Sequence, residues 1–414
     1  MSKLTSKGVD AIKQIVNDAT LDPHKTIPGL SVSIINNKGE DLVSYANGVK
    51  SADSSERVST DSLWWLASCT KIVATIAVLQ LVEQGRLDLD DSDQLESIIP
   101  ELKHVPIASE DSEGNIVLKP KTKRITLRML LSHTSGFGYS FFSPVLQKWK
   151  EYFAVDEFNA SLPQELLFPL LFEPGTDWQY GVGIDWAGVA LERVTGEKLG
   201  DYIKNHILIP LGLTESSFTP DELQRSKLVD ISRRDGQTGE LSTIKHYYQK
   251  VVTGSYDELF FHSGGAGLFS KPHDYVQILS VILNDGESPK TGARILSKDF
   301  VDLLFTNQIP QWPDFGRKGL PDADPLLTNA LDEIYPQGSA PQGWGLSWFL
   351  TPEPGATGRG ANTAFWCGIA NCFYWCDREK GIAGMVAGQI LPFGDAQVLG
   401  SWVQIESAVY ANLE

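Results

Sequence analysis

Residues Trp64 to Gly85 read WWLASCTKIVATIAVLQLVEQG, and the rest of the chain is organised around this segment. Its apolar residues from Ile72 to Val82 cover almost every angle of a period of about 3.6 residues, which predicts a helix enclosed on all sides. Gly85 offers a stop for that helix. Ser68 then lies at the N-terminus, and Lys71, three residues later, lies on the same face. The sequence therefore predicts a hydroxyl and an amine side by side.

This pairing suits nucleophilic catalysis, because a serine hydroxyl is a weak nucleophile until an adjacent base removes its proton. Burial disfavours the charged form of a lysine and lowers its pKa, and a helix N-terminus stabilises negative charge on the serine oxygen. The same Ser-x-x-Lys spacing recurs from Ser242 to Lys245, in a polar stretch that opens no apolar helix. The motif alone therefore does not decide, and its context must.

Composition limits the classes of function. The chain has 414 residues, of which 42% are hydrophobic and 21% charged, which is typical of a globular protein with room for two domains. A net charge of −17 argues against nucleic acid as a partner. The basic run 119–124 follows an acidic loop, and this pattern indicates a solvated hairpin. No apolar run is long enough to cross a membrane, and no secretory core is visible near the N-terminus, so we expect a cytoplasmic location.

The four cysteines, Cys69, Cys367, Cys372 and Cys376, are too few to form a disulfide framework in so long a chain. We expect free thiols. A zinc site is the sharper alternative, but the C-x2-C spacing is missing and strand alternation would point some of these side chains apart. No metal and no cofactor is predicted.

The order of predicted elements indicates the fold class. Helices are expected near 4–19, 126–132, 164–172, 185–195, 199–208, 274–284, 297–305 and 397–411, and strands near 30–35, 42–46, 345–350, 371–376 and 381–389, with a proline-rich loop at 309–342. Strands near both ends enclose a helical middle. We predict an α+β fold, in which an antiparallel sheet flanked by terminal helices (1–62 and 285–414) carries an inserted, mainly helical domain (63–284).

A second proton carrier is expected in the stretch from Phe172 to Gly181, FEPGTDWQYG. Its Pro-Gly pair makes a turn, so Tyr180 would be carried on a loop just before the helix that begins near Asp185. A tyrosine with its ordinary pKa of about 10 is a poor base unless nearby cations or donors favour the phenolate. Most tyrosines only pack, so this residue alone does not establish a site.

Four motifs then occur in a recognisable order: Ser68-x-x-Lys71, the segment LRMLLSHTSG at 127–136, the segment from Pro174 to Tyr180, and Trp366-Cys367-Gly368. This order resembles the serine β-lactamase and penicillin-binding-protein superfamily. Within it, the chain is similar to class C β-lactamase-like esterases and to fungal acyltransferases of the lovastatin type. The resemblance covers essentially the whole chain, and Tyr-Gly-x-x-x-Asp-Trp-Ala-Gly, beginning at Tyr180, is among its most specific parts.

The resemblance implies that Ser68 is the acylated nucleophile and that Lys71 and Tyr180 share the roles of general base and acid. Which of the two takes the first proton stays open. The third motif, Trp366 to Gly368, is expected at a sheet edge that faces the serine. The backbone N–H groups of Ser68 and Ile369 would form the oxyanion hole, in which one donor is worth about 3 kcal/mol.

Two other segments invite functional readings. His133 could be nominated for a Ser-His-Asp triad, but the chain contains no G-x-S-x-G elbow, which disfavours an α/β-hydrolase. The resemblance implies a structural role for His133. The glycine-rich stretch 264–267 lacks a phosphate-binding signature, and we expect it to be a tight backbone passage beside the site.

The chain also departs from the penicillin-recognising pattern. Trp366 stands where those proteins carry a cationic lysine, and Val182 stands where they tend to carry the asparagine of Tyr-x-Asn. The loss of both polar contacts disfavours β-lactam hydrolysis and favours an apolar ester. Trp312, Trp344 and Trp366 either border the site or simply pack. Together with Cys367-Gly368 and Val182, they are the candidate substrate-binding residues.

The sequence thus predicts a serine hydrolase that forms an acyl-enzyme on Ser68 and cleaves carboxylic esters of small, largely apolar molecules. The close alternative is an acyltransferase that moves a short acyl group onto an alcohol of a secondary metabolite, with an acyl-carrier domain or a thioester as donor. Less favoured readings are β-lactam hydrolysis and a non-catalytic ligand-binding module. Neither nucleic acid nor a membrane is expected as a partner.

Overall fold

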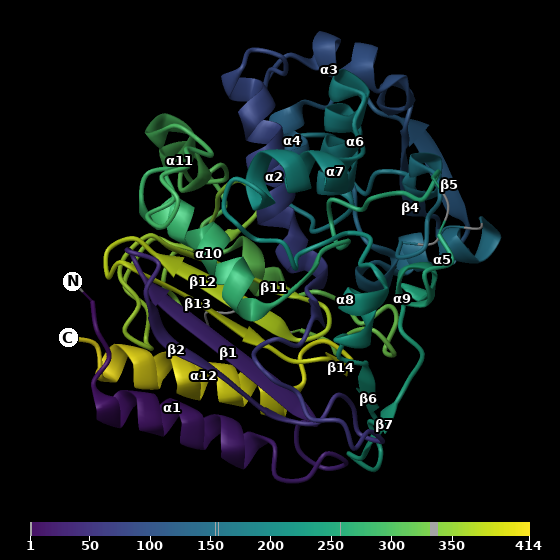
Figure 1. The fold of residues 1–414 in the computed structure, drawn as a ribbon. Helices are drawn as coiled ribbons and strands as arrows, with labels where there is room; N and C mark the ends of the chain where they lie inside the picture. The colour runs from purple at the N-terminus through teal and green to yellow at the C-terminus, as the bar shows by residue number, and fades with distance from the viewer. Residues whose placement is uncertain (1, 154, 156, 257, 332–337) are drawn as a thin grey trace.

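A seven-stranded antiparallel sheet forms the base of the molecule in the computed structural model, which describes residues 2–153, 155, 157–256, 258–331 and 338–414 (Figure 1). The strand order is β2-β1-β13-β12-β11-β10-β9. The strands are β1 (Gly29–Asn36), β2 (Asp41–Gly48), β9 (Gly343–Trp344), β10 (Phe349–Thr351), β11 (Thr363–Gly368), β12 (Cys372–Asp377) and β13 (Ile382–Ala387). The predicted antiparallel sheet, built from both ends of the chain, is confirmed.

Helices cover both faces of this sheet. The terminal helices α1 (Ser6–Ala19) and α12 (Ala396–Ala411) pack against each other below it, and α10 (Pro272–Leu283) packs against β1 and β13 above it (Figure 1). Every residue of β1 is buried as a result. The backbones of Lys3 and Glu414 exchange hydrogen bonds of 3.0 and 2.8 Å, so the two ends of the chain lie side by side.

The mainly helical region lies above the sheet (Figure 1). It contains α2 (Thr70–Glu83), α3 (Ser92–Ile98), α4 (Leu127–Leu131), α5 (Pro144–Tyr152), α6 (Gly183–Thr195), α7 (Leu199–Ile203), α8 (Glu222–Ser226) and α9 (Gln249–Thr253), while α11 (Lys298–Leu304) follows α10. Helix α2 packs against α6 and α7 and is buried from Thr70 to Leu81. The all-round burial predicted from its apolar residues is confirmed.

Short strands complete the structure. They are β3 (Trp64–Trp65) paired with β8 (Phe269–Ser270), the hairpin of β4 (Pro106–Glu110) and β5 (Ile116–Pro120), and β14 (Ile390–Leu391), β6 (Ser232–Arg234) and β7 (Leu241–Thr243) in a third small sheet. The polar hairpin expected around the basic run is confirmed. Ser242, of the second Ser-x-x-Lys match, lies exposed in β7 and opens no helix.

The prediction of a helix at 164–172 is wrong. Only a short 3-10 turn, Pro163–Leu166, forms there. The N–H of Leu170 donates to the carbonyl of Pro106 (2.8 Å), and the N–H of Ala108 donates to the carbonyl of Leu170 (2.8 Å). The segment therefore runs beside β4, because its backbone groups find partners in another strand and not within a helix.

The strand expected at 345–350 is interrupted. The N–H of Gly345 donates to the carbonyl of Trp348 (2.9 Å), which closes a turn between β9 and β10. Ser347 in this turn has a φ of +77°, and a Cβ on Gly345 would overlap the carbonyl oxygen of Leu304. Close packing against α11 therefore overrides the alternating pattern. β11, which has no predicted range of its own, forms at 363–368.

The proposed division into two domains stays a prediction, with one observation bearing on it. A boundary at 284 assigns α10 to the helical part, whereas α10 packs directly on the sheet.

The four cysteines are free, as expected. No helix in the described part of the chain combines the length and the apolar character needed to cross a membrane. The cytoplasmic location stays a prediction.

Candidate active site

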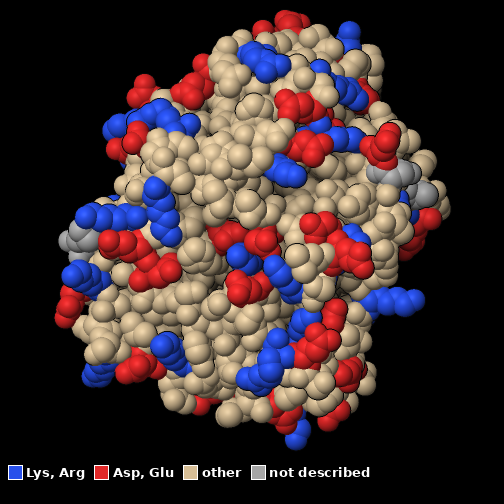
Figure 2. All heavy atoms as spheres, in the orientation of Figure 1, with Lys and Arg blue, Asp and Glu red and all other residues tan. Residues whose placement is uncertain are grey.

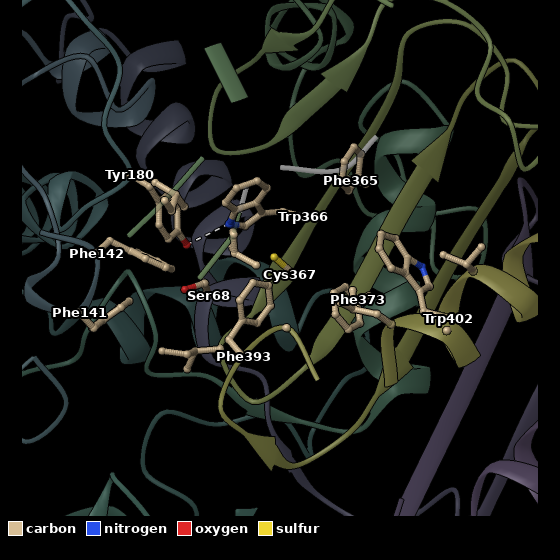
Figure 3. Close-up of a pocket in the computed structure, with 17 residues that line it drawn as sticks. Ser68, Phe141, Phe142, Tyr180, Phe365, Trp366, Cys367, Phe373, Phe393 and Trp402 are labelled. Atoms are coloured by element: carbon tan, nitrogen blue, oxygen red, sulfur yellow. Dashed lines mark hydrogen bonds between the residues drawn. The ribbon is translucent and has the colours of Figure 1, made fainter. Parts of the chain in front are cut away.

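Ser68 lies in a 3-10 turn, Ala67–Cys69, that leads directly into α2. Ala67 has a φ of +45°, a conformation that alanine rarely adopts and that persists only where surrounding contacts enforce it. The hydroxyl of Thr70 supplies such contacts, since it donates to the carbonyl of Ala67 (2.6 Å) and accepts from the N–H of Leu268 (2.9 Å). The turn leaves Ser68 7% exposed at the wall of a cavity (Figure 3).

Lys71 is fully buried one turn beyond Ser68. Its Nζ lies 3.1 Å from Ser68 Oγ, 2.9 Å from the hydroxyl of Tyr139 and 2.9 Å from the carbonyl oxygen of Gly265. Burial lowers the pKa of Lys71 to about 7, against the opposing charge of Asp185. A large fraction of the amine is therefore neutral at physiological pH.

The three neighbours of Lys71 determine what the neutral amine can do. A neutral amine keeps two N–H donors and one lone pair. Two donors are needed for the carbonyl of Gly265 and the hydroxyl oxygen of Tyr139, which lie at equal distances. The lone pair is then left for the hydroxyl of Ser68. The arrangement is that of a nucleophile with its general base.

Tyr180 reaches the same point from the loop before α6 and is only 4% exposed. Its hydroxyl accepts a hydrogen bond from Trp366 Nε1 (2.9 Å) and faces Ser68 (Figure 3). Its ring centroid lies 4.7 Å from Lys71 Nζ. Burial raises the pKa of Tyr180 well above its usual value, although hydrogen bonds with Ser68 and Trp366 act against this. The phenol is therefore protonated at neutral pH and suits the role of a proton donor.

The glycine-rich stretch 264–267 lies beside the site, as expected. Its conformation is fixed by Asp185, whose Oδ1 accepts hydrogen bonds from Ser263 Oγ (2.5 Å) and from the N–H of Gly265 (2.9 Å). Burial raises the pKa of the Asp185 carboxyl, although the charge of Lys71 acts against this. Asp185 thus holds the carbonyl of Gly265 in place for Lys71.

The end of β11 carries the third motif. β10 pairs only with Thr363 to Phe365, so Trp366 to Gly368 extend beyond it. A Cβ on Gly368 would overlap the carbonyl oxygen of Leu66, two residues before the serine. The glycine is thus required by the protein backbone itself, which brings Ile369 to the same cavity as Ser68. The oxyanion hole formed by the N–H groups of Ser68 and Ile369 stays a prediction.

The cavity in front of Ser68 has a volume of about 440 Å³, within the range of small-molecule sites. Phe141 and Phe142, Trp366 and Phe393 form the walls nearest to the serine (Figure 3). None of the described residues that line it is an aspartate, glutamate, lysine or arginine. A ligand in this cavity must therefore be largely apolar, because a buried charge would lack a partner.

The structure divides the candidate substrate-binding residues. Trp366 and Cys367 line the cavity. Trp344 is fully buried behind the wall, with its ring 4.6 Å from that of Trp366, and so supports it. Val182 is fully buried just before α6, and Trp312 is partly exposed on the proline-rich loop. Neither Trp344, Val182, Trp312 nor Gly368 is among the described lining residues.

Sequence reasoning missed Tyr139 and the aromatic cluster that follows it. Tyr139 contacts Lys71 and stacks on Phe141, with ring centroids 4.8 Å apart. These residues lie in FGYSFF (137–142), directly after the HTSG segment. Only that proximity to a motif could have drawn attention to them, because the run has neither helical nor strand periodicity.

His133 supports the tyrosine loop. Its Nδ1 accepts from the N–H of Gly181 (3.3 Å), and its ring centroid lies 4.7 Å from that of Tyr180. Burial lowers the pKa of His133 well below its usual value, so the ring is neutral. These contacts fit the structural role expected for this histidine.

Comparisons with known proteins identify the family of this chain and several of its relatives. The Beta-lactamase family profile matches residues 17–401. Lovastatin esterase of Penicillium rubens is 35% identical, over 90% of this chain and 92% of its own. Monacolin J acid methylbutanoyltransferase of Aspergillus terreus is 30% identical, over 84% and 82% respectively. The solved structure of simvastatin synthase from Aspergillus terreus (LovD6 mutant) has a TM-score of 0.79 at 27% identity, over 99% of this chain and 98% of its own.

The family match spans most of the chain, and two of these relatives bear the names of an esterase and of a methylbutanoyltransferase. Three features of the structure also suit an enzyme that acts on apolar esters: the fold, the buried Ser-x-x-Lys pair and the apolar cavity. This chain belongs to the β-lactamase family, among its serine esterases and acyltransferases.

Proposed function

We propose that this protein cleaves carboxylic esters of small, largely apolar molecules through an acyl-enzyme on Ser68. The carrying observation is the buried amine of Lys71, 3.1 Å from Ser68 Oγ, whose pKa is lowered to about 7. A base with a pKa near the working pH is effective in general-base catalysis. The apolar cavity beside it supplies the binding site for the ester.

In the proposed reaction, Ser68 Oγ adds to the ester carbonyl carbon while its proton passes to the neutral amine of Lys71. The oxyanion is held by the N–H groups of Ser68 and Ile369. The C–O bond then breaks, and the leaving alkoxide takes the phenolic proton of Tyr180, which Lys71 replaces with the proton it received. Water attacks the acyl-enzyme with the same groups acting in reverse, and releases the acid and free Ser68.

Acyl transfer to an alcohol is the second candidate. It differs only in the group that attacks the acyl-enzyme, and relatives that bear the name of acyltransferases favour it. For that reaction we propose a thioester or an acyl-carrier domain as donor. Hydrolysis is the preferred reading, because a site that forms an acyl-enzyme is open to water unless its loops exclude it.

The other readings have less support. A β-lactam carries a carboxylate, and the described lining of the cavity offers it no cation. Trp366 occupies the position in the third motif where penicillin-recognising proteins carry a lysine. A non-catalytic binding module has no need for a lysine whose pKa is lowered to about 7 beside a serine. We therefore place both behind ester hydrolysis and acyl transfer.

Product analysis distinguishes hydrolysis from transfer. The purified protein is incubated with lovastatin, or with p-nitrophenyl butyrate, in the presence and absence of monacolin J acid as an acceptor alcohol. Chromatography with mass detection then measures free acid and transferred ester. We expect free acid in every mixture. Exclusive formation of the transferred ester would replace hydrolysis by acyl transfer, and neither product from any ester would contradict the proposed function.

A further inference from the structure

The cavity extends well beyond the catalytic groups, between the sheet and the C-terminal helix. We call this extension the distal arm. It is lined by Phe365, Phe373, Leu399, Gly400, Trp402 and Val403. Tyr180, Phe141 and Phe142 lie on one side of Ser68, and Phe373 and Trp402 lie on the other (Figure 3). The arm is continuous with the space in front of the serine, because both belong to one cavity.

The walls of the distal arm are held in place. The rings of Phe373 and Trp402 stack at 4.4 Å with an angle of 13°. The guanidinium of Arg359 lies over the rings of Phe365 (4.3 Å) and Trp402 (5.5 Å). Two hydrogen bonds of 2.6 Å tie that guanidinium to Glu406 of α12, and both side chains are buried. The arm is thus a preformed space, and a ligand need not open it.

Gly400 keeps the arm open. It lies inside α12, where glycine is less favourable than any residue except proline. A Cβ at this position meets no atom within 4 Å, so packing does not require a glycine there. The neighbouring Leu399 and Val403 border the same space, and Val403 is 37% exposed. The missing side chain therefore leaves volume inside the arm that an alanine or leucine would occupy.

We propose that the distal arm binds an extended hydrocarbon part of the ester, so that the enzyme selects substrates with one long apolar side. This inference rests on the proposed esterase function. Each methylene group that leaves water for such a surface favours binding by a factor of about four. No charged side chain among the described lining residues must lose its hydration when the chain enters.

The hydrocarbon has two chemical sources, the acyl chain and the alcohol, since the carbonyl carbon at Ser68 carries both. Two series of esters distinguish them. The first contains p-nitrophenyl acetate, butyrate, hexanoate and octanoate. The second contains the acetates of ethanol, butanol, hexanol and octanol, followed by titration of released acid. The measured quantity is the ratio of kcat/KM for the longest ester to kcat/KM for the shortest.

In wild-type protein we expect this ratio to exceed about 10 in one series, which names the source. Gly400→Leu places a side chain in the arm and should lower the ratio in that series by about tenfold or more. Gln404→Leu, a matched change at an exposed position of α12, should leave the ratio as in the wild type. The leucine also favours the helix, which helps Gly400→Leu to fold.

Two results would overturn the inference while leaving the esterase function intact: ratios near one in both series, or a Gly400→Leu ratio equal to that of the wild type. Absence of turnover on every ester would contradict the proposed function instead. Circular dichroism checks folding. If Gly400→Leu does not fold, Val403→Trp narrows the same arm from its partly exposed edge, and the same fall in the ratio is required.

Discussion

At the scale of single residues, Lys71 couples burial to chemistry. Burial brings its pKa to about 7, and only the neutral amine can accept the proton of Ser68. We therefore expect kcat/KM for ester hydrolysis to rise as the pH increases towards about 7 and to level off above it. Steady-state assays between pH 5 and pH 9 on one p-nitrophenyl ester measure this. A rate that falls as the pH rises through 7 would contradict the role of Lys71 as base.

Asp185 is a positioning residue whose charge can be separated from its hydrogen bonds. Both contacts to Ser263 and Gly265 end on Oδ1, so Asp185→Asn keeps an acceptor while removing the charge. The carboxylate raises the pKa of Lys71, and its loss should lower that pKa. The inflection of the pH profile should therefore move to lower pH, with the fold intact.

A matched control for that shift is Glu157→Gln. Glu157 is also a buried carboxylate, and it accepts from the N–H and the hydroxyl of Ser140 (2.7 and 2.8 Å), but it is not among the charges that act on Lys71. We expect the pH profile of the Glu157→Gln variant to have its inflection at the same pH as that of the wild type. Equal shifts in both variants, or no shift in Asp185→Asn, would remove the assigned role of Asp185.

Tyr180 is expected to matter most when the leaving group is a poor one. Its raised pKa keeps the phenol protonated, and an alkoxide leaves only when it receives a proton. Tyr180→Phe should slow acylation by about 100-fold with an alkyl ester and by less with a p-nitrophenyl ester, whose phenolate leaves unprotonated. Stopped-flow acylation rates on the two esters provide the comparison. An equal loss on both would argue against proton donation by Tyr180.

The site could be predicted only in part. The spacing of Ser68 and Lys71 predicts that their side chains are neighbours on one face of a helix. The family resemblance predicts Tyr180 as the third catalytic residue. Tyr139 could not be found, because its contact with Lys71 depends on the path of an irregular loop. The sequence also leaves open whether Trp344 borders the site or only packs, because it does not tell which side of a strand faces a cavity before the topology is known. In the structure, Trp344 lies behind the wall.

At the scale of elements, periodicity succeeds where local and tertiary preferences agree. α2 is apolar on all sides and is enclosed on all sides, so its sequence determines both its type and its place. The segment 164–172 has apolar residues that fit a helix as well as a strand. Its backbone instead binds β4 through Leu170, a partner about 60 residues away that no local pattern reveals.

The junction between α10 and β2 should give the fold a pH dependence. His273, near the start of α10, pairs with Asp274 (3.5 Å) and with Asp41 of β2 (3.2 Å), and these contacts raise the pKa of His273 to about 9. The pKa in the unfolded chain is about 6.5. The stabilisation is therefore fully present below about pH 6.5 and is lost as the pH rises through 9.

His273→Gln should accordingly lower the thermal midpoint at pH 6 and have little effect at pH 10. Calorimetry of both proteins at the two pH values measures the difference. A variant that is destabilised equally at pH 6 and pH 10 would show that the histidine contributes through packing and not through its charge.

At the scale of the whole molecule, the site lies where the sheet meets the helical region. Ser68 and Lys71 come with α2, Tyr180 comes with the loop before α6, and Trp366 comes with β11. The hydrogen bond between Trp366 and Tyr180 joins the two parts directly. Catalysis therefore depends on the correct placement of both the sheet and the helical region. The predicted boundary at 284 assigns α10 to the helical region, whereas α10 packs on the sheet.

The distribution of charged side chains over the surface and the cavity suits a small, uncharged ligand. Acidic and basic side chains are interspersed over the face shown in Figure 2, with no continuous basic stripe there. The net charge is −17, whereas the described lining of the cavity carries no charged side chain. The cavity therefore offers the substrate an apolar lining in a molecule whose net charge is strongly negative.

The proposed mechanism requires that Ser68 becomes acylated. Intact-protein mass spectrometry after rapid mixing with p-nitrophenyl butyrate and an acid quench measures this acylation. We predict one added acyl mass in the wild type, located on the peptide that contains Ser68, and no added mass in a folded Ser68→Ala variant. An adduct that persists in Ser68→Ala, or ester turnover by that variant at the wild-type rate, would contradict the account.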